Sequence, residues 1–460
     1  MKSNKLKTII GIFSFVVFVS SCHIGERNTV QKPNVLLIFS DDHQASAIKA
    51  LGNPYIKTPS IDKLVREGTS MVEAFTETPT CAPSRAALLT GCGSLTHGTF
   101  YPGYTQSANK KLKRWPQVMQ DAGYQTFWTG KFNAHGKPSE WGIEETSLIF
   151  QRGMGEHNMI LKENGKEITG FSSEIFADAL IDFINKPYEK PFFATVAFTA
   201  PHDPRTPPKK YARLYKANEV PLPANFMSHY NYQDGYDSIR DEMLLPYPRK
   251  VDDVKKEIAA YYGLISHMDE QIGRIMGALK ANGLEENTIV IYASDNGLAL
   301  GNHGLLGKFS FYDHSLKVPL IMKGPAIQKN YKSNVRVYLH DLFPTICTLT
   351  GVEIPSSVES KSFVSALKGD TTCIHKYMFG SLSNLKRSVS TKDYKLIRHY
   401  RSNWHGKIKG TDEYLFLDLK NDPLEIINKI NDTAFSEIIL ELKEVLRNRQ
   451  IEKKDFLSAE

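Results

Sequence analysis

A cysteine, a serine and an arginine stand close together in the stretch from Cys81 to Arg85, which reads Cys-Ala-Pro-Ser-Arg, and Thr90-Gly91 follows. A free cysteine commonly packs as a small core hydrophobe, and its reactivity depends on its surroundings. One interpretation is therefore a buried thiol beside a proline turn. The other is a reactive or modified cysteine.

Two further polar clusters have residue types suited to a metal ion. Asp41-Asp42 follows the apolar run from Val35 to Phe39, and Asp295-Asn296 follows the run from Thr288 to Ala293. Carboxylate and amide oxygens are the ligands that calcium prefers, with magnesium as the alternative. Either cluster alone is more often a helix cap or a turn. Taken together, the two clusters form a set of hard oxygen ligands suited to such an ion.

Lysines and histidines form a third group of candidates. Lys131 and His135 follow a predicted strand, His202 follows another, and His303 precedes Lys308 in a glycine-rich segment. The simplest alternative is a set of surface lysines and turn histidines. Histidine suits proton transfer because its ordinary pKa lies near neutrality.

The elements that must position these side chains alternate between strand-like and helix-like patterns. Short, continuous apolar runs predict strands buried on both faces. They cover residues 35–39, 126–129, 193–198 and 288–293. Helices are predicted at 60–67, 84–89, 115–122 and 254–282, which places Cys81 just before a helix N-terminus. This alternation predicts an α/β fold with a largely parallel sheet, whose strand ends form the site.

The pattern changes after Gly351. Short strands at 394–398 and 414–418 and a terminal amphipathic helix at 437–449 predict a smaller α+β subdomain. We therefore divide the chain into a leader at 1–22, a catalytic domain at 33–350 and a C-terminal subdomain at 351–460. Residues 204–250, rich in proline, tyrosine and asparagine, predict a long ordered loop that serves as a lid or wall.

The cysteine stretch resembles the modification signature of the type I sulfatases, in which a maturase oxidises the cysteine to a formylglycine aldehyde. Segments around Lys131, His202 and Lys308 resemble other segments of that family, so the likeness runs from Pro33 to Pro325. The resemblance implies an alkaline-phosphatase-like fold with an antiparallel C-terminal subdomain. It also implies hydrolysis of sulfate esters by the hydrated aldehyde. One hydroxyl attacks sulfur, and deprotonation of the other expels sulfate.

The resemblance assigns roles to individual residues. Arg85 would orient the formylglycine hydroxyl, Lys131 and Lys308 would bind the sulfate, and His135 would be the base of the elimination step. His202 would bind sulfate and protonate the leaving alcohol. His303 and His97 are candidate substrate contacts. The implied metal ligands are listed together: Asp41, Asp42, residue 81, Asp295 and Asn296.

The chain departs from the family pattern at two positions. Cys92 follows Thr90-Gly91 where many relatives carry arginine, and His314 stands where an acidic residue is usual. Neither position is expected to be catalytic. The five cysteines include no Cys-x-x-Cys pair, so a zinc site or a disulfide scaffold is not expected.

The composition indicates a globular protein and argues against a nucleic-acid-binding function. The 460 residues carry a formal net charge of +7, with 41% hydrophobic and 23% charged residues. This is an ordinary globular composition, and no nucleic-acid motif accompanies the charge. The resemblance implies an exo-acting O-sulfatase on sulfated host or algal glycans. Two alternatives stay open: a phosphatase or phosphodiesterase of the same superfamily, and a glycan-binding lipoprotein whose Cys81 is never oxidised.

The N-terminus predicts export. Lysines precede an apolar run from Ile9 to Val19, which is too short to span a membrane and is typical of a signal peptide. Val-Ser-Ser-Cys, ending at Cys22, resembles a bacterial lipobox. We therefore expect a periplasmic protein that is anchored to the membrane by a lipid on Cys22, with the cell surface as the alternative.

Overall fold

The computed structural model describes Met1 and residues 32–457, apart from 102–103, 106–108, 110, 233–238 and 405–406. Residues from Lys32 onward form one compact unit. The predicted signal peptide and the lipobox at Cys22 lie outside the described residues. Among the helices that are described, none is long and apolar enough to cross a membrane.

A mixed sheet of eight strands forms the centre of this unit. Every residue of its middle strands is buried and most of them are apolar, as expected for strands that are covered on both faces. All neighbouring pairs are parallel except those that involve β12. The order is β13 (Tyr331–Ser333), β2 (Thr69–Met71), β12 (Leu320–Lys323), β11 (Thr288–Ser294), β1 (Asn34–Ser40), β10 (Phe192–Ala197), β6 (Gln125–Lys131) and β7 (Glu145–Phe150).

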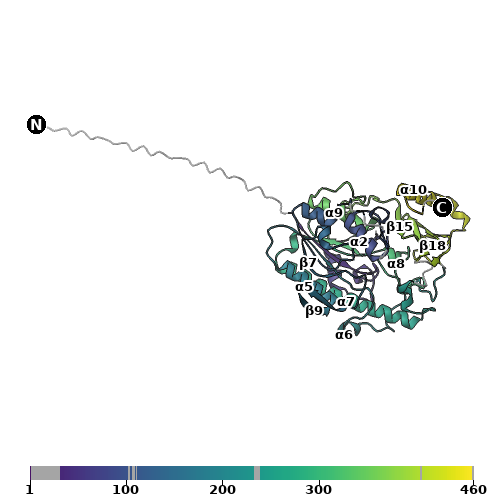
Figure 1. Ribbon diagram of the computed structural model, residues 1–460, viewed down its shortest axis with the longest axis horizontal. Coiled ribbons are helices and arrows are strands. Elements are labelled where there is room, and N and C mark those ends of the chain that lie inside the picture. Colours follow the sequence, from purple (N-terminus) through teal and green to yellow (C-terminus); the bar gives the residue numbers. More distant parts are fainter. Residues whose placement is uncertain are drawn as a thin grey trace. The chain divides into compact units, whose positions relative to one another are not determined.

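Helices cover both faces of this sheet (Figure 1). Alternate residues of β1 point to opposite faces, so Val35 and Leu37 join one core cluster while Leu36 and Ile38 join the other. The first cluster includes residues of α2 (Cys81–Thr90), α4 (Trp115–Asp121) and α9 (Leu342–Thr350). The second includes residues of α1 (Pro59–Glu67), α5 (Ser172–Ile184) and α7 (Val251–Ala281).

An antiparallel sheet follows near the C-terminus, and a helix packs on it (Figure 1). Val389, Leu396 and Phe416 of this sheet pack against Leu442 and Leu446 of the helix. The elements are β15 (Met378–Leu382), β16 (Lys386–Ser390), β17 (Tyr394–His399), β20 (Glu413–Asp418) and α10 (Ser436–Glu452). The remaining short elements include β3 (Ala74–Phe75), β14 (Val337–Tyr338), α3 (Ser94–His97), β4 (Thr99–Tyr101), β5 (Tyr104–Thr105), β8 (Asn158–Glu163), β9 (Lys166–Phe171), α6 (Lys209–Ala212), η4 (Arg240–Leu244), α8 (Asp313–Leu316), β18 (Ser402–Trp404) and β19 (Lys407–Lys409).

The predicted fold class is confirmed: a largely parallel sheet between helices, with a small antiparallel sheet and a terminal helix. One boundary differs, because α2 begins at Cys81 itself and not after it. Pro83 fits there, since the first turn of a helix does not need its N–H groups. The division of the chain at residue 350 stays a prediction. Among its described residues, the loop predicted at 204–250 includes the short helices α6 and η4.

Candidate active site

The carboxyl ends of two neighbouring strands bring the acidic residues together. β1 and β11 are parallel and adjacent, and Ser40 pairs with Ser294, so Asp41-Asp42 and Asp295-Asn296 leave the sheet side by side. The Asn296 side-chain amide donates to Asp42 Oδ1 at 2.8 Å, and the Asp42 backbone N–H donates to Asp295 Oδ1 at 3.1 Å. The sequence predicted this meeting from the strand ends.

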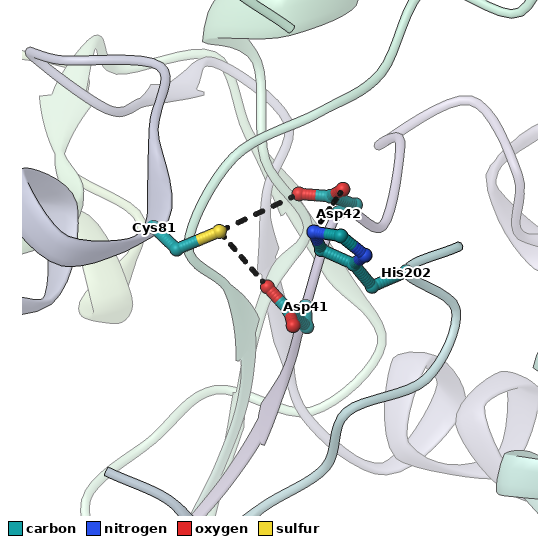
Figure 2. A group of neighbouring side chains, drawn as sticks. All are labelled: Asp41, Asp42, Cys81 and His202. Atoms are coloured by element: carbon teal, nitrogen blue, oxygen red, sulfur yellow. Dashed lines mark hydrogen bonds and ion pairs between the residues drawn. The ribbon is translucent and has the colours of Figure 1, made fainter. Parts of the chain in front are cut away.

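Cys81 points from the first turn of α2 toward these carboxylates (Figure 2). Its Sγ lies 3.2 Å from Asp41 Oδ1 and 3.9 Å from Asp42 Oδ1. Ligand atoms of Asp41, Asp42, Cys81 and His202 all lie within 4.8 Å of one another, and all four residues are buried. The Ser84 hydroxyl fixes the helix start by donating to the carbonyl oxygen of Asp295 at 2.6 Å.

Two buried lysines contact the carboxylates of the cluster. Lys131, at the end of β6, places Nζ 2.5 Å from Asp41 Oδ2. Lys308 places Nζ 2.7 Å from both oxygens of Asp42 and 3.2 Å from Cys81 Sγ. Both side chains are at most 5% exposed, so their charges are poorly screened by water.

A buried arginine completes the set of cations. The Arg85 guanidinium donates Nε–H to Asp295 Oδ2 at 3.0 Å and Nη1–H to the Lys131 carbonyl oxygen at 2.9 Å. It also lies over the Phe39 ring, with Cζ 4.9 Å from the centroid. Arg85 thus ties the helix of Cys81 to the ends of β6 and β11.

His202 faces the cluster with one defined nitrogen. Its Nδ1 lies 2.8 Å from the Asp203 carbonyl oxygen, which can only accept, so Nδ1 carries a proton. Nε2 lies 3.6 Å from Asp42 Oδ2 and is therefore the nitrogen that can exchange a proton. Behind it, His157 Nε2 donates to the His202 carbonyl oxygen at 2.8 Å. Burial lowers the pKa of His157 to about 4, so this support is uncharged at neutral pH.

The charges of the cluster set the protonation of its members. Burial by itself would raise the pKa of the Asp41 carboxyl, but Lys131, His202 and Arg85 outweigh it and hold that pKa well below the usual range. Burial, and next the charge of Asp41, raise the pKa of the Cys81 thiol well above its ordinary value. The unmodified cysteine is thus a protonated thiol, which is a poor nucleophile.

The oxygen atoms of this cluster fit a hard divalent cation. Three buried carboxylates and one amide converge, and the Asn296 Oδ1 atom is buried without a hydrogen-bond partner among the described residues. A buried polar oxygen of this kind is costly unless something binds it. Oxygen donors favour calcium or magnesium over the softer transition metals. Both oxygens of Asp295 already accept N–H groups from this chain.

The structure places His135 outside the cluster. Its side chain is exposed, and its carbonyl oxygen accepts the Trp141 indole N–H at 2.8 Å. Asn133 has a positive φ of 40° and Gly136 one of 85°, and these residues turn the chain toward the surface directly after Lys131. No hydrogen bond or ion pair within the described residues links the His135 imidazole to Cys81. Its role as the base stays a prediction without geometric support.

The two candidate substrate histidines also lie away from the cluster. His97 is 2% exposed and accepts the Thr99 N–H on Nδ1 at 3.1 Å, and burial lowers its pKa to about 3. His303 stacks on Tyr312 at 4.0 Å between ring centroids and donates from Nε2 to the Leu424 carbonyl oxygen at 3.1 Å. In this structure both side chains contact loop backbone, and their contact with substrate stays a prediction.

The two departures from the family pattern are packing positions, Cys92 buried and His314 partly buried. Cys92 Sγ lies 3.0 Å from the Ser357 carbonyl oxygen, and His314 Nε2 lies 3.0 Å from the Ser310 hydroxyl. In the described chain, Cys81, Cys92, Cys347 and Cys373 are free thiols. Sequence reasoning missed His157, because no motif surrounds it and only the folded chain brings it under His202.

Comparison with known proteins decides the family. The model of the sulfatase family matches residues 33–352, which is more than half of the chain. The chain belongs to the sulfatase family. This sulfatase is a sulfuric ester hydrolase, and its C-terminal region, residues 301–452, also matches the model described as N-sulphoglucosamine sulphohydrolase, C-terminal. The predicted recognition and enzyme class are thereby confirmed.

Relatives extend over nearly the whole sulfatase chain. An N-acetylglucosamine-6-O-sulfatase from Bacteroides thetaiotaomicron is 25% identical over 99% of this chain and 92% of its own. An arylsulfatase from Clostridium perfringens is 29% identical over 90% of this chain and 94% of its own. A solved structure of a protein in complex with its substrate D-glucosamine-2-N,6-O-disulfate has a TM-score of 0.79 and 25% identity, covering 93% of this chain and 99% of that one.

Proposed function

We propose that this sulfatase hydrolyses a sulfate ester on a sugar, with 6-O-sulfated glucosamine or N-acetylglucosamine as the substrate class. The observation that carries the proposal is the set of three buried side chains, Lys131, Lys308 and His202, that contact the carboxylates beside Cys81, since such a set suits a compact anion. The relative named N-acetylglucosamine-6-O-sulfatase and the protein solved with a glucosamine disulfate support the choice of sugar. Exo-action on host or algal glycan fragments, such as glycosaminoglycan or mucin sugars, belongs to the same proposal.

The nucleophile would be residue 81 after a maturase has oxidised Cys81 to formylglycine. The hydrated aldehyde would attack sulfur with one hydroxyl and release sulfate when the other is deprotonated, which splits one difficult step into two. The raised pKa of the Cys81 thiol supports this proposal, because the unmodified side chain is not ionised at neutral pH. A serine at the same position would have no second hydroxyl and no route to elimination.

The charged side chains would divide the work on the sulfate group. Asp41 Oδ1, 3.2 Å from Sγ, would accept a hydrogen bond from the group at position 81 and orient it. Arg85 would hold that helix start against Asp295. Lys131 and Lys308 would bind sulfate oxygens, and positioned cations of this kind can supply the largest catalytic effect. Lys308 would also stabilise charge on the bridging oxygen as the alcohol leaves.

His202 would protonate the departing alcohol through Nε2. The Nδ1–H bond to the Asp203 carbonyl oxygen fixes the ring orientation, so that only Nε2 faces the cluster. A general acid needs this kind of positioning within reach of the leaving oxygen. His135 stays the proposed base that takes the proton of the second formylglycine hydroxyl in the elimination step, and in this structure its side chain is exposed.

Asp41, Asp42, Asp295 and Asn296 would hold a calcium ion, with magnesium as the alternative. The ion would supply positive charge beside residue 81 and the sulfate group. The Asn296 Oδ1 atom, buried without a partner among the described residues, supports this assignment.

A panel of regiospecifically sulfated sugars tests the proposed substrate. The enzyme would be produced with a maturase, checked by mass for the aldehyde at residue 81, and supplied with calcium. We expect sulfate release from a 6-O-sulfated glucosamine derivative and none from the Cys81→Ser control. Release only from galactose, N-acetylgalactosamine or 2-O-sulfated uronate members would overturn the choice of sugar. If residue 81 of the native protein stays a cysteine, the sulfated-glycan-binding function replaces the enzymatic one.

Export and anchoring are a separate part of the proposal. Periplasmic location with a lipid on Cys22 is supported by the lysines, the apolar run and the Val-Ser-Ser-Cys ending of the leader. Mass measurement of the mature N-terminus and membrane fractionation of a Cys22→Ser variant test it. A soluble wild-type protein that is cleaved elsewhere would refute the anchor.

A further inference from the structure

The short helix η4 and the residues after it contact two catalytic segments that the main sheet does not connect directly. η4 covers Arg240–Leu244 and belongs to the long loop that follows His202 in the chain. Arg240 of η4 forms an ion pair with Asp203, which follows His202. Glu242 of η4 accepts hydrogen bonds from the two residues just before Lys308. We propose that Glu242, paired with Arg249, is a positioning residue that sets the place of Lys308 during departure of the alcohol; this rests on the proposed role of Lys308.

The Glu242 carboxylate holds two backbone N–H groups next to Lys308. Oε1 accepts the Gly307 N–H at 2.8 Å, and Oε2 accepts the Leu306 N–H at 2.9 Å. Glu242 is 1% exposed, so water does not compete for these bonds. Hydrogen bonds to a buried carboxylate are stronger than neutral ones.

Arg249 fixes that carboxylate and a third backbone atom of the same loop. Its Nη2 lies 2.5 Å from Glu242 Oε2, and its Nε donates to the Gly304 carbonyl oxygen at 3.1 Å. The guanidinium also lies over the Tyr247 ring, with Cζ 3.7 Å from the centroid. Arg249 is 2% exposed. Two charged side chains therefore hold residues 304–307 at three backbone atoms.

The loop needs such support because its backbone is irregular. Leu300, Gly301, His303 and Gly304 all have positive φ values, between 49° and 100°. At Gly307, an added Cβ would lie 2.8 Å from Asp241 Cβ and 3.0 Å from Glu242 Oε1. Glycine thus allows the close approach of the loop to Glu242. Lys308 follows directly, so a shift of this loop moves its ammonium group.

The same helix, η4, also contacts the segment that carries His202, the proposed general acid. Arg240 Nη1 donates to Asp203 Oδ1 at 3.2 Å, and Asp203 Oδ1 lies 3.3 Å from His202 Nδ1. Arg240 and Glu242 are close in sequence, so η4 links the His202 segment to the Lys308 segment. His202 and Lys308 are the two residues that are proposed to act on the leaving alcohol. A change at Glu242 should therefore affect that step more than sulfate binding.

The test is the dependence of the rate on the leaving group. Lys308→Ala, Glu242→Gln and the wild type would be compared on aryl sulfates whose phenols have graded pKa values. Because Lys308 stabilises the leaving oxygen, its loss should slow poor leaving groups most and steepen the plot of log kcat/KM against phenol pKa. We expect Glu242→Gln to steepen the plot in the same direction, with roughly ten- to a hundredfold more loss for the poorest leaving group than for the best. The double variant should be no steeper than Lys308→Ala.

A matched control distinguishes an effect on the position of Lys308 from a general loss of protein stability. Arg387 and Asp455 form another buried ion pair, at 2.7 Å, which links β16 to the segment after α10. The pair also forms hydrogen bonds with Ser383, Lys386, Gln450 and Leu457. Asp455→Asn should lower the melting temperature and leave the slope at the wild-type value. If Glu242→Gln proves poorly folded, Arg249→Lys keeps the charge, loses the Gly304 contact and should give an intermediate slope.

Amide hydrogen exchange gives a readout that does not depend on turnover. In Glu242→Gln, the N–H groups of Leu306 and Gly307 should exchange faster, while those of β11 stay protected. A wild-type slope and unchanged exchange in Glu242→Gln, beside a steepened slope in Lys308→Ala, would overturn the inference. A wild-type slope in Lys308→Ala would instead overturn the proposed role of Lys308.

Discussion

Replacing Glu77 with glutamine should change how the stability of this sulfatase depends on pH. Glu77 precedes α2 and is 9% exposed, and it lines a cavity of about 330 Å3 against the C-terminal sheet and α10. Its Oε2 accepts the Ser94 N–H at 2.9 Å. The charged and titratable residues that also line the cavity are His340, Glu359, Lys361, His375, Lys376 and Arg449.

Burial dominates the ionisation of Glu77. It raises the pKa from 4.5 to about 7, although the Ser94 N–H and Arg449 act in the opposite direction. Each unit corresponds to 1.36 kcal/mol, so ionising Glu77 in the folded protein costs about 3 kcal/mol of stability. Between pH 4.5 and 7 the folded state holds more protons than the unfolded state. This part of the stability is therefore complete below pH 4.5 and is lost as the pH rises to 7.

Thermal unfolding at pH 4.5 and pH 8 measures this effect. For the compact unit from Lys32 to Glu460, the unfolding entropy is near 0.9 kcal/mol/K, so about 3 kcal/mol corresponds to a Tm shift of roughly 3–4 °C. The Tm of Glu77→Gln minus that of the wild type should rise by this amount from pH 4.5 to pH 8, because glutamine is never ionised.

A second carboxylate of the same cavity is the control. Burial by itself would raise the pKa of Glu359, but its bond with Lys453 outweighs burial and lowers that pKa. The contribution of Glu359 is therefore present above pH 4.5 and is lost as the pH falls. The Tm difference for Glu359→Gln should stay level or fall over the same range. A pH-independent Tm difference for Glu77→Gln would refute the reasoning.

Two other changes test the metal site and the strand that carries Lys131. Asn296→Ala should weaken calcium binding to the metal-free protein by roughly tenfold or more in calorimetric titration; unchanged affinity would remove Asn296 from the ligand set. Gly130→Ala should lower the free energy of unfolding by more than about 2 kcal/mol, because φ is 87° and an added Cβ would lie 2.1 Å from the Ala197 carbonyl oxygen. Gly123→Ala, where φ is 91° with open space around it, is the matched control and should lose about 1 kcal/mol in denaturant titration; equal losses would contradict the steric argument.

Local sequence patterns determined the layered fold and most of the site. Apolar runs such as Val35–Phe39 are too short for helices and carry no polar face, so they had to be doubly buried strands. Polar residues at the ends of such strands then had to meet at one edge of the sheet. This reasoning located Asp41, Asp42, Asp295 and Lys131 without coordinates. The Cys-Ala-Pro-Ser-Arg stretch added the reactive position by its resemblance to a family.

Tertiary structure decided the features that depend on contacts between distant segments. The antiparallel direction of β12 follows from its pairing with β11 and β2, which no periodicity within four residues can encode. His135 was predicted from the resemblance of its segment to a family motif, and only the folded chain shows that its side chain is exposed after the positive φ of Asn133. His157 and Glu242 stand in no motif. Their roles come from burial against backbone atoms of other segments, and only the folded chain brings those atoms within hydrogen-bonding distance.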